Sequence, residues 1–446
     1  MRDRVSPLSL SLFLPLFLSL GPAAGAAEPE ALTLSRALAI AREQSEVSAI
    51  AAARLERAEA VRRLAVSQLV PDLGFSGIYT RRSREVTRQV GGDEVTVQTR
   101  DALNGTLALD SVLFDARSIP GIRAATRSLA AQRFESAELE RALAYDVSTI
   151  FFAVLSAERL QQAAERRVEV AARTVEDARI RLDAGLAARN ELTRSELELA
   201  SARLAETQAQ SQVRTARLAL GLLLARSVDG PLVEPPPFSD PGSDLAALVD
   251  RAAANSGELM ALAERVEAAR QRALVPALGF VPTLDLRAIY RGTNEAGLSG
   301  RERDWNVAVT LGWSLFDGGA RRAERAIAES EWREADLQLA QRQREVAAAV
   351  ERSLSDLGTA RAALAQAEAQ AEVARQNADE VGERFAQGLA SGLEQADALV
   401  ARFEAEAELA RQGFSLHLSQ LALLQALGEL PLPAGPSDTP SFETAP

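Results

Sequence analysis

The side chains that most often carry covalent chemistry or bind soft metals are nearly missing from this sequence. It has no cysteine, one histidine, His417, and only arginine among its 50 basic residues. Thiolate chemistry, histidine triads, multi-histidine metal sites and a catalytic lysine are therefore excluded. The abundant polar groups are carboxylates and guanidinium groups, which attract, repel and pair. We expect no enzyme activity, no cofactor and no metal site, and the net charge of −12 disfavours nucleic acid as a partner.

Charged side chains with a repeated spacing surround two glycine turns. Each turn contains an arginine, then a glycine, a leucine and a glutamate. The members are Arg181, Gly185, Leu186 and Glu191 in the first copy and Arg384, Gly388, Leu389 and Glu394 in the second. Asp397 follows in the second copy, where the first copy has Arg194. Glycine suits the left-handed residue that ends a helix, and a carboxylate after the turn complements the dipole of the next helix.

An internal duplication positions these two turns. Val70-Pro-Asp-Leu73 recurs as Val281-Pro-Thr-Leu284, and Leu113-Phe-Asp115 recurs as Leu315-Phe-Asp317. Each copy predicts a helix, a strand, a loop, a strand, a very long helix, a tight turn near 185 or 388, and a helix. The predicted segments are a first repeat at 27–226, a Pro-rich linker at 227–242, a second repeat at 243–428 and a tail at 429–446.

The first residues have the pattern of an export signal. Arg2 and Arg4 precede an apolar run from Leu8 to Leu20, which is too short to cross a bilayer as a helix. Small residues follow, and the Ala24-x-Ala26 pattern places cleavage nearby. The sequence therefore predicts a signal peptide at 1–26 and an exported chain.

The predicted strands, about 72–84, 97–114, 283–292 and 304–316, alternate apolar and polar side chains. The apolar set that we expect to face lipid is Tyr79, Leu107, Leu109, Tyr290, Trp305, Val309, Leu311 and Trp313. A soluble sheet with one wet face is the alternative, but it needs an apolar layer on the other face. Four strands cannot close a membrane barrel, so other copies of the chain must complete it, giving eight strands from two copies or twelve from three.

The predicted helices are far longer than a globular domain needs. Gly121 to Ala184 and Gly319 to Gln387 contain no proline, and each would span about 100 Å as a helix. The helices before and after them, among them 35–69 and 243–275, are about half as long. Half-length helices stacked end to end can line the full-length ones, with the linker and the tail at mid-height. Apolar residues spaced by seven, among many alanines, favour coiled-coil packing.

These features together resemble the TolC-like outer-membrane efflux protein family. The resemblance covers residues 31–428 and rests on the duplicated Pro-x-Leu strand entry, the Leu-Phe-Asp strand exit and the Arg-x-x-x-Gly-Leu turn. It implies a mainly helical α+β fold, in which a homotrimer forms a twelve-stranded transmembrane β-barrel, four strands per protomer, continued by a long periplasmic α-helical barrel. It also implies an outer-membrane location and a passive exit duct of a tripartite efflux or type I secretion system.

The resemblance gives roles to the residues at the two turns. It implies that Glu191, Glu394 and Asp397 narrow the periplasmic entrance, with Arg181, Arg384 and Arg194 as nearby counter-charges. The carboxylates could equally serve only as helix-dipole complements. Gly185, Leu186, Gly388 and Leu389 are the implied contacts for a periplasmic adaptor, which links the duct to an inner-membrane pump or exporter.

One rival interpretation concerns the class of protein. A periplasmic adaptor also carries long helical hairpins, but it usually has one hairpin, whereas this chain has two together with paired amphipathic strands. The cargo stays open among drugs, metal ions and proteins, because a duct need not bind what it conducts.

Overall fold

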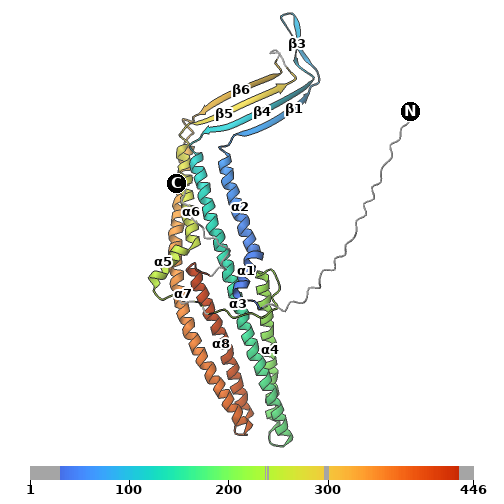
Figure 1. Ribbon diagram of the computed structural model, residues 1–446, viewed down its shortest axis with the longest axis vertical. Helices are drawn as coiled ribbons and strands as arrows, with labels where there is room; N and C mark the ends of the chain where they lie inside the picture. The colour runs from blue at the N-terminus through green and yellow to red at the C-terminus, as the bar shows by residue number, and fades with distance from the viewer. Residues whose placement is uncertain (1–30, 237, 239–240, 296–300, 431–446) are drawn as a thin grey trace, which may run out of the picture.

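The computed structural model describes residues 31–236, 238, 241–295 and 301–430 of the 446-residue chain. The predicted signal peptide and most of the predicted tail lie outside these residues. Long helices run side by side away from a single sheet, which crosses one end of the molecule (Figure 1). The two helical hairpin tips lie at the opposite end.

The sheet takes strands from both repeats. Its members are β1 (Asp72–Arg81), β4 (Asp101–Phe114), β5 (Thr283–Thr293) and β6 (Arg303–Gly312), in the order β1-β4-β5-β6. All neighbouring pairs are antiparallel. The inner pair, β4 and β5, joins the two repeats, and β1 and β6 are left as edges with unpaired backbone groups.

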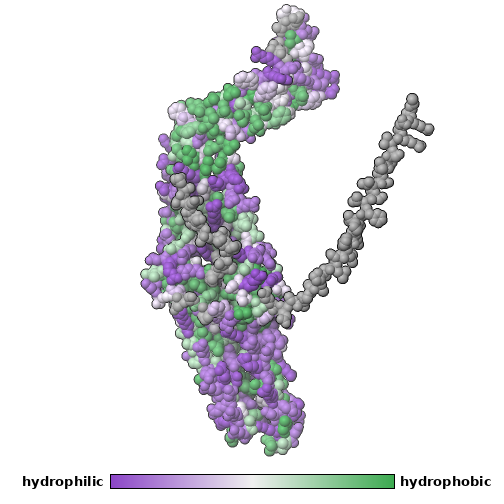
Figure 2. All heavy atoms as spheres, viewed as in Figure 1, coloured by the Kyte–Doolittle hydropathy of each residue, from purple (hydrophilic) through white to green (hydrophobic). Residues whose placement is uncertain are grey.

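The strand register places apolar side chains in rows on one face of the sheet. Leu107 lies opposite Tyr290, which lies opposite Trp305, and Phe75 lies opposite Leu107. Directly paired residues share a face, so these side chains form one row. Figure 2 shows hydrophobic residues gathered over the sheet, whereas the lower helices are largely hydrophilic. Large apolar side chains of this face, such as Phe75 at 76% and Trp305 at 71%, are exposed in the single chain.

A second, smaller sheet extends the first repeat beyond the main one. Strands β2 (Val86–Val90) and β3 (Asp93–Gln98) form an antiparallel hairpin that projects past the far end of the sheet (Figure 1). Gly91 and Gly92 make its turn with φ of 67° and 103°, as expected from the Gly-Gly-Asp sequence. The segment 86–98 therefore belongs to this hairpin, and the main strands are shorter than the predicted 72–84 and 97–114.

Two pairs of helices form the long hairpins. They are α3 (Ser118–Asp183) with α4 (Arg189–Leu223), and α7 (Ala320–Ala386) with α8 (Gly392–Ala426). In the half next to the tips, α4 packs on α3, α3 on α8 and α8 on α7. In the half next to the sheet, α2 packs on α3, α3 on α6 and α6 on α7. The long helices α3 and α7 therefore run through both halves, and each half-length helix packs against a long helix in one half only.

The prediction of one unbroken helix before each sheet entry is wrong. The structure has α1 (Leu34–Gln44) and α2 (Glu46–Ser67) in the first repeat, and α5 (Leu245–Asn255) and α6 (Gly257–Leu278) in the second. Ser45 and Ser256 separate them with extended backbone, at ψ of 137° and 107°. Each serine hydroxyl accepts a hydrogen bond from the next helix, from Val47 N at 3.2 Å and from Leu259 N at 3.2 Å. The serine caps thus offset the broken helix hydrogen bonds.

The main hydrophobic core lies at mid-height, where the half-length helices meet. The fully buried side chains there include Phe151, Val154, Leu220, Leu224 and Leu421. The linker joins this belt, because Leu32 N donates to Pro231 O at 2.9 Å and Val233 N donates to Leu32 O at 3.0 Å. This position agrees with the mid-height belt expected from the helix lengths.

Within the described part of the chain, no helix combines the length and the apolarity that a membrane-spanning helix needs.

Candidate functional site

The two hairpin tips have the same backbone geometry. Gly185 and Gly388 adopt φ of 71° and 77°, which glycine reaches without strain. At the first tip Gly185 N donates to Leu182 O at 2.9 Å, and Leu186 N donates to Arg181 O at 2.8 Å. The second tip repeats both hydrogen bonds at the same distances. Each tip is therefore a Schellman turn, which satisfies the last carbonyls of its long helix.

Arg181 connects the first tip to the second. Its guanidinium donates to Phe385 O at 2.5 Å and stands over the Phe385 ring, 4.2 Å from the centroid. The Phe385 side chain is 1% exposed, so it is buried under this arginine. A guanidinium at the carboxyl end of α7 also complements the negative end of the helix dipole. The contact joins residues from different repeats and holds the two hairpins together.

Arg384, the counterpart of Arg181, does not repeat this contact. Its side chain is exposed and makes no hydrogen bond or ion pair within the described residues, although its backbone carbonyl accepts from Leu389 N in the turn. Its charge acts instead on Glu394, whose pKa lies below its ordinary value. The first cause of that shift is a hydrogen bond from Ser391 N, at 2.7 Å, and the Ser391 hydroxyl and Arg384 add to it.

Glu394 is part of a capping box at the start of α8. Ser391 Oγ accepts from Glu394 N at 3.3 Å, while the Glu394 carboxylate accepts from Ser391 N. The equivalent start of α4 has Ala188 at the cap position and no side-chain cap. Glu394 therefore has the helix-start role that the sequence left open beside the gate role.

The other predicted gate residues lie around the same tips without joining one cluster. Glu191 packs across the hairpins, since a side chain on Gly392 would lie 3.1 Å from its Cγ. Asp397 and Arg194 are both exposed and make no ion pair in the described structure. Within the described residues, Arg181 hydrogen-bonds to the other hairpin and Glu191 lies against Gly392 of the other hairpin.

The predicted adaptor-contact residues lie at the extreme end of the molecule. The Leu186 side chain is 80% exposed and the Leu389 side chain is 66% exposed. A leucine held outward by a rigid turn offers apolar area to a partner, and it does not pack beside its own glycine. Both side chains are therefore mostly uncovered by the described chain.

The predicted lipid-facing residues share one face of the sheet, with one exception. Pairing links Leu109 to Ala288 and Val307, Leu286 to Val309, and Leu284 to Leu311. Trp313 lies just past the end of β6, where its indole N–H donates to Phe280 O at 3.1 Å. The strand therefore ends earlier than the predicted 304–316, and the predicted membrane-facing role of Trp313 stays a prediction.

A buried arginine at the junction of sheet and helix was missed by sequence reasoning. Arg321 contacts Asp317 Oδ2 at 2.5 Å and donates to Gly279 O at 2.8 Å and Ser314 O at 2.6 Å. Its guanidinium lies 4.4 Å from the centroid of the Phe280 ring. Asp317 has its pKa lowered to about 2, first by the Arg321 side chain and then by the Arg321 and Gly319 backbone N–H groups. Only the order Phe-Asp-Gly-Gly, with an arginine one turn on, hints at this network.

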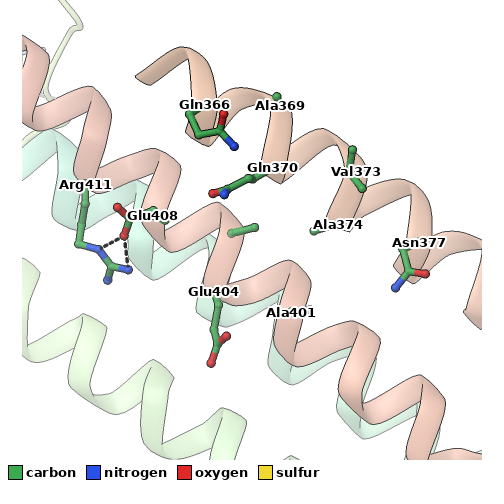
Figure 3. A pocket seen from close by; sticks show the side chains of 11 residues that line it. Gln366, Ala369, Gln370, Val373, Ala374, Asn377, Ala401, Glu404, Glu408 and Arg411 are labelled. Atoms are coloured by element: carbon green, nitrogen blue, oxygen red, sulfur yellow. Dashed lines mark hydrogen bonds and ion pairs between the residues drawn. The ribbon is translucent and has the colours of Figure 1, made fainter. Parts of the chain in front are cut away.

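An open groove runs along α7 and α8 in the half next to the tips. Its volume is about 890 Å³, and its lining mixes alanines and Val373 with polar side chains, among which Glu408 and Arg411 are paired at 2.7 Å (Figure 3). Val373 of α7 is 66% exposed there. At the opposite flank, α4 exposes leucines at multiples of seven, namely Leu197, Leu204 and Leu218. Both flanks of the helical layer thus carry apolar side chains with no partner inside the described chain.

His417 is a packed residue of α8. Its ring stacks on Phe152, with centroids 4.2 Å apart, and burial lowers its pKa. Among the described residues, no three acidic, histidine or cysteine side chains come together as metal ligands would.

Three kinds of comparison relate this chain to known proteins. A family model described as "Outer membrane efflux protein" matches residues 38–226 and 248–429. Protein CyaE of Bordetella pertussis is 30% identical over 251 residues, which are 54% of this chain and 53% of that protein. The chain therefore spans about half the length of that curated relative.

Solved structures share the fold at low identity. The outer membrane protein VceC of Vibrio cholerae matches with a TM-score of 0.73 at 20% identity, over 89% of this chain and 96% of that one. The MtrE outer membrane channel of Neisseria gonorrhoeae, in its open state, matches with a TM-score of 0.75 at 18% identity, over 90% of each chain. The CmeC outer membrane channel of Campylobacter jejuni matches with a TM-score of 0.75 at 15% identity, over 89% of this chain and 85% of that one.

Proposed function

Because this chain belongs to the outer membrane efflux protein family, we propose that three copies form a passive exit duct across the outer membrane and the periplasm. The duct would receive cargo from an inner-membrane pump or exporter through a periplasmic adaptor, in an efflux or type I secretion system. The energy comes from the pump. The family match carries this proposal, and it removes the support for the rival adaptor interpretation.

The open sheet supports assembly. β1 and β6 are edge strands, and each protomer supplies four strands, so three copies would supply twelve. Unpaired backbone groups are too costly in hydrocarbon for an open sheet to persist there. Pairing β1 of one copy with β6 of the next closes the sheet, with the apolar rows outward and the polar face lining a channel.

The helical flanks support the same assembly. In each copy α7 lies at one flank, with α5 packed on it at mid-height, while α2 and α4 form the other flank. The α2 flank exposes Val61 at 53% and Leu64 at 65%, and the α7 flank exposes Ile327 at 59% and Leu337 at 69%. Closing a ring would let α7 of one copy cover α2 and α4 of the next and bury these side chains.

The acidic residues at the tips give the duct a charged entrance. In three copies, Glu191, Glu394 and Asp397 would form rings that favour cations. Since Glu394 caps α8 and Glu191 packs on Gly392, Asp397 is the carboxylate with no local partner in the described structure. We assign the main cation preference to Asp397.

Planar-bilayer recording of the purified protein tests the duct. We expect a large, cation-preferring conductance in three-copy particles, and Asp397→Asn should reduce the cation preference more than Glu394→Gln does. The absence of any conductance from purified trimers would contradict the proposal. Equal selectivity of the D397N variant and the wild type would remove Asp397 from the entrance.

A further inference from the structure

The apolar face of the sheet ends in charged residues at the end far from the helices. Its outermost aromatic side chains are Tyr79 on β1, Tyr290 on β5 and Trp305 on β6. Two residues beyond Tyr79 comes Arg81, and two residues before Trp305 comes Arg303. Alternate residues of a strand share a face, so both arginines lie on the apolar face, just past the aromatic side chains.

Arg303 has no counter-charge among the residues that the structure describes. On the sheet it lies opposite Gly292, which carries no side chain, and an added Cβ at Gly292 would meet nothing within 4 Å. Arg303 is exposed, and no carboxylate of the described chain lies within 4 Å of it. Its guanidinium is therefore available to a ligand beside open space on the strand surface.

Arg81 is only loosely paired. Its Nε lies 3.8 Å from Asp101 Oδ1, and the two side chains are 64% and 50% exposed. The same carboxylate oxygen accepts a 2.6 Å hydrogen bond from the Tyr79 hydroxyl. An exposed ion pair of this kind contributes little to stability. Most N–H donors of the Arg81 guanidinium therefore remain available to an anion.

The arginines of the opposite face are matched with acids. Arg287 lies 3.3 Å from Asp110, and Arg291 is paired in register with Asp304. The two faces of the same sheet thus differ in charge balance. On the polar face each of these arginines has an acidic partner, whereas Arg303 on the apolar face has none in the described structure. Unbalanced positive charge beyond an aromatic row complements an anionic membrane surface.

We propose that Arg81 and Arg303 bind the phosphate groups of lipid headgroups in the outer leaflet of the membrane. This inference rests on the proposed function, which puts the apolar face against lipid and the far end of the sheet outside. A guanidinium binds a phosphate through two parallel hydrogen bonds, which an ammonium cannot do. Since β1 and β6 are the edge strands, Arg81 of one copy and Arg303 of the next would lie along one seam.

Native mass spectrometry of the full-length protein in neutral detergent tests this binding. The probes are diphosphoryl lipid A and the same lipid without its phosphates. Arg81→Gln with Arg303→Gln should weaken binding of the phosphorylated lipid about thirtyfold, from about fivefold for each arginine near an anionic lipid surface. Arg303→Lys should give an intermediate loss. The control is Arg291→Gln, on the same end of the sheet but the opposite face, which should bind as the wild type does.

Three results would overturn the inference: unchanged binding by the double variant, an equal loss in R291Q, or full competition by millimolar inorganic phosphate. The last result would indicate a site for free phosphate. The same spectra report the oligomeric state of the protein, and bound lipid is counted on monomers and trimers alike. Absence of trimers would therefore count against the proposed function, while trimers that bind both lipids equally would count against the lipid inference alone.

Discussion

The two hairpin tips carry the same turn with the same hydrogen bonds, yet different side chains stabilise them. At the first tip Arg181 leaves its own hairpin and binds the end of α7 at Phe385. At the second tip Arg384 stays in solvent, and Ser391 with Glu394 caps the next helix instead. The first tip is held by a contact with the other hairpin, whereas the second is stabilised by hydrogen bonds within its own hairpin.

This difference shows what duplication has kept and what it has changed. The glycine turn is a backbone requirement, so both copies retain it. The arginine before it is present twice but makes a cross-hairpin contact once, because only α7 presents a phenylalanine and two terminal carbonyls to it. The contact between hairpins is therefore one-directional, and the tips should respond unequally to equal substitutions.

The largest expected effect is from Arg181→Ala against Arg384→Ala. R181A loses the charged hydrogen bond and the ring contact, which should destabilise the contact between the two tips by about 2 kcal/mol. That corresponds to about a thirtyfold change in the balance between joined and separated tips. We expect R181A to raise the open probability in planar bilayers and to speed hydrogen exchange at both tips.

The matched variant Arg384→Ala tests whether the Phe385 contact causes this effect. R384A removes an arginine from the same place in the turn without breaking a contact, so its open probability should match the wild type. Equal gains from both variants would mean that total positive charge at the tips, and not the Phe385 contact, controls the opening.

A smaller effect is expected from exchanging the helix caps. Ser391→Ala removes the capping box and should cost about 1 kcal/mol of local stability in the first turn of α8. Ala188→Ser places a hydroxyl three residues before Glu191, which recreates the same box at α4. Hydrogen exchange in the two first turns should therefore move in opposite directions, faster in S391A and slower in A188S. Unchanged exchange in A188S would mean that Glu191 is held by Gly392 and cannot turn to the cap.

The smallest effect concerns the junctions between sheet and helix. Asp317, with its pKa lowered to about 2, contributes stability above its ordinary pKa of 3.8, and this contribution is lost as pH falls towards 2. The difference in Tm between the wild type and Asp317→Asn should therefore be present at pH 6 and shrink towards pH 2. Asp115→Asn in the first repeat should show a smaller difference, because within the described residues the Asp115 carboxylate accepts hydrogen bonds from Arg117 alone. A difference that does not change with pH would show that Asp317 acts through shape and not through its charge.

Sequence patterns predicted the features that repeat along the chain. The long helices, expected at 121–184 and 319–387, occur at Ser118–Asp183 and Ala320–Ala386, because proline-free runs with sevenfold spacing specify them. The alternation in 304–316 gave the correct face for Trp305, Val309 and Leu311, since the period of a strand is two.

Features that depend on distant residues could not be predicted. The breaks at Ser45 and Ser256 lie in patterns that continue as helices on both sides, so the apolar pattern alone does not mark them. The Arg181 contact joins residues 204 positions apart, and Arg321 binds Gly279, 42 positions away. The spacing of neighbouring residues holds no information about such pairs. The partners of the candidate gate residues could therefore be identified only from the folded structure.

The most direct test of the three-copy duct is the mass of the particle extracted with detergent from separated inner and outer membranes. We expect a trimer in the outer-membrane fraction, because closure of the β1 and β6 edges is what satisfies the sheet in lipid. A monomer, or a particle found in the soluble or inner-membrane fraction, would contradict it.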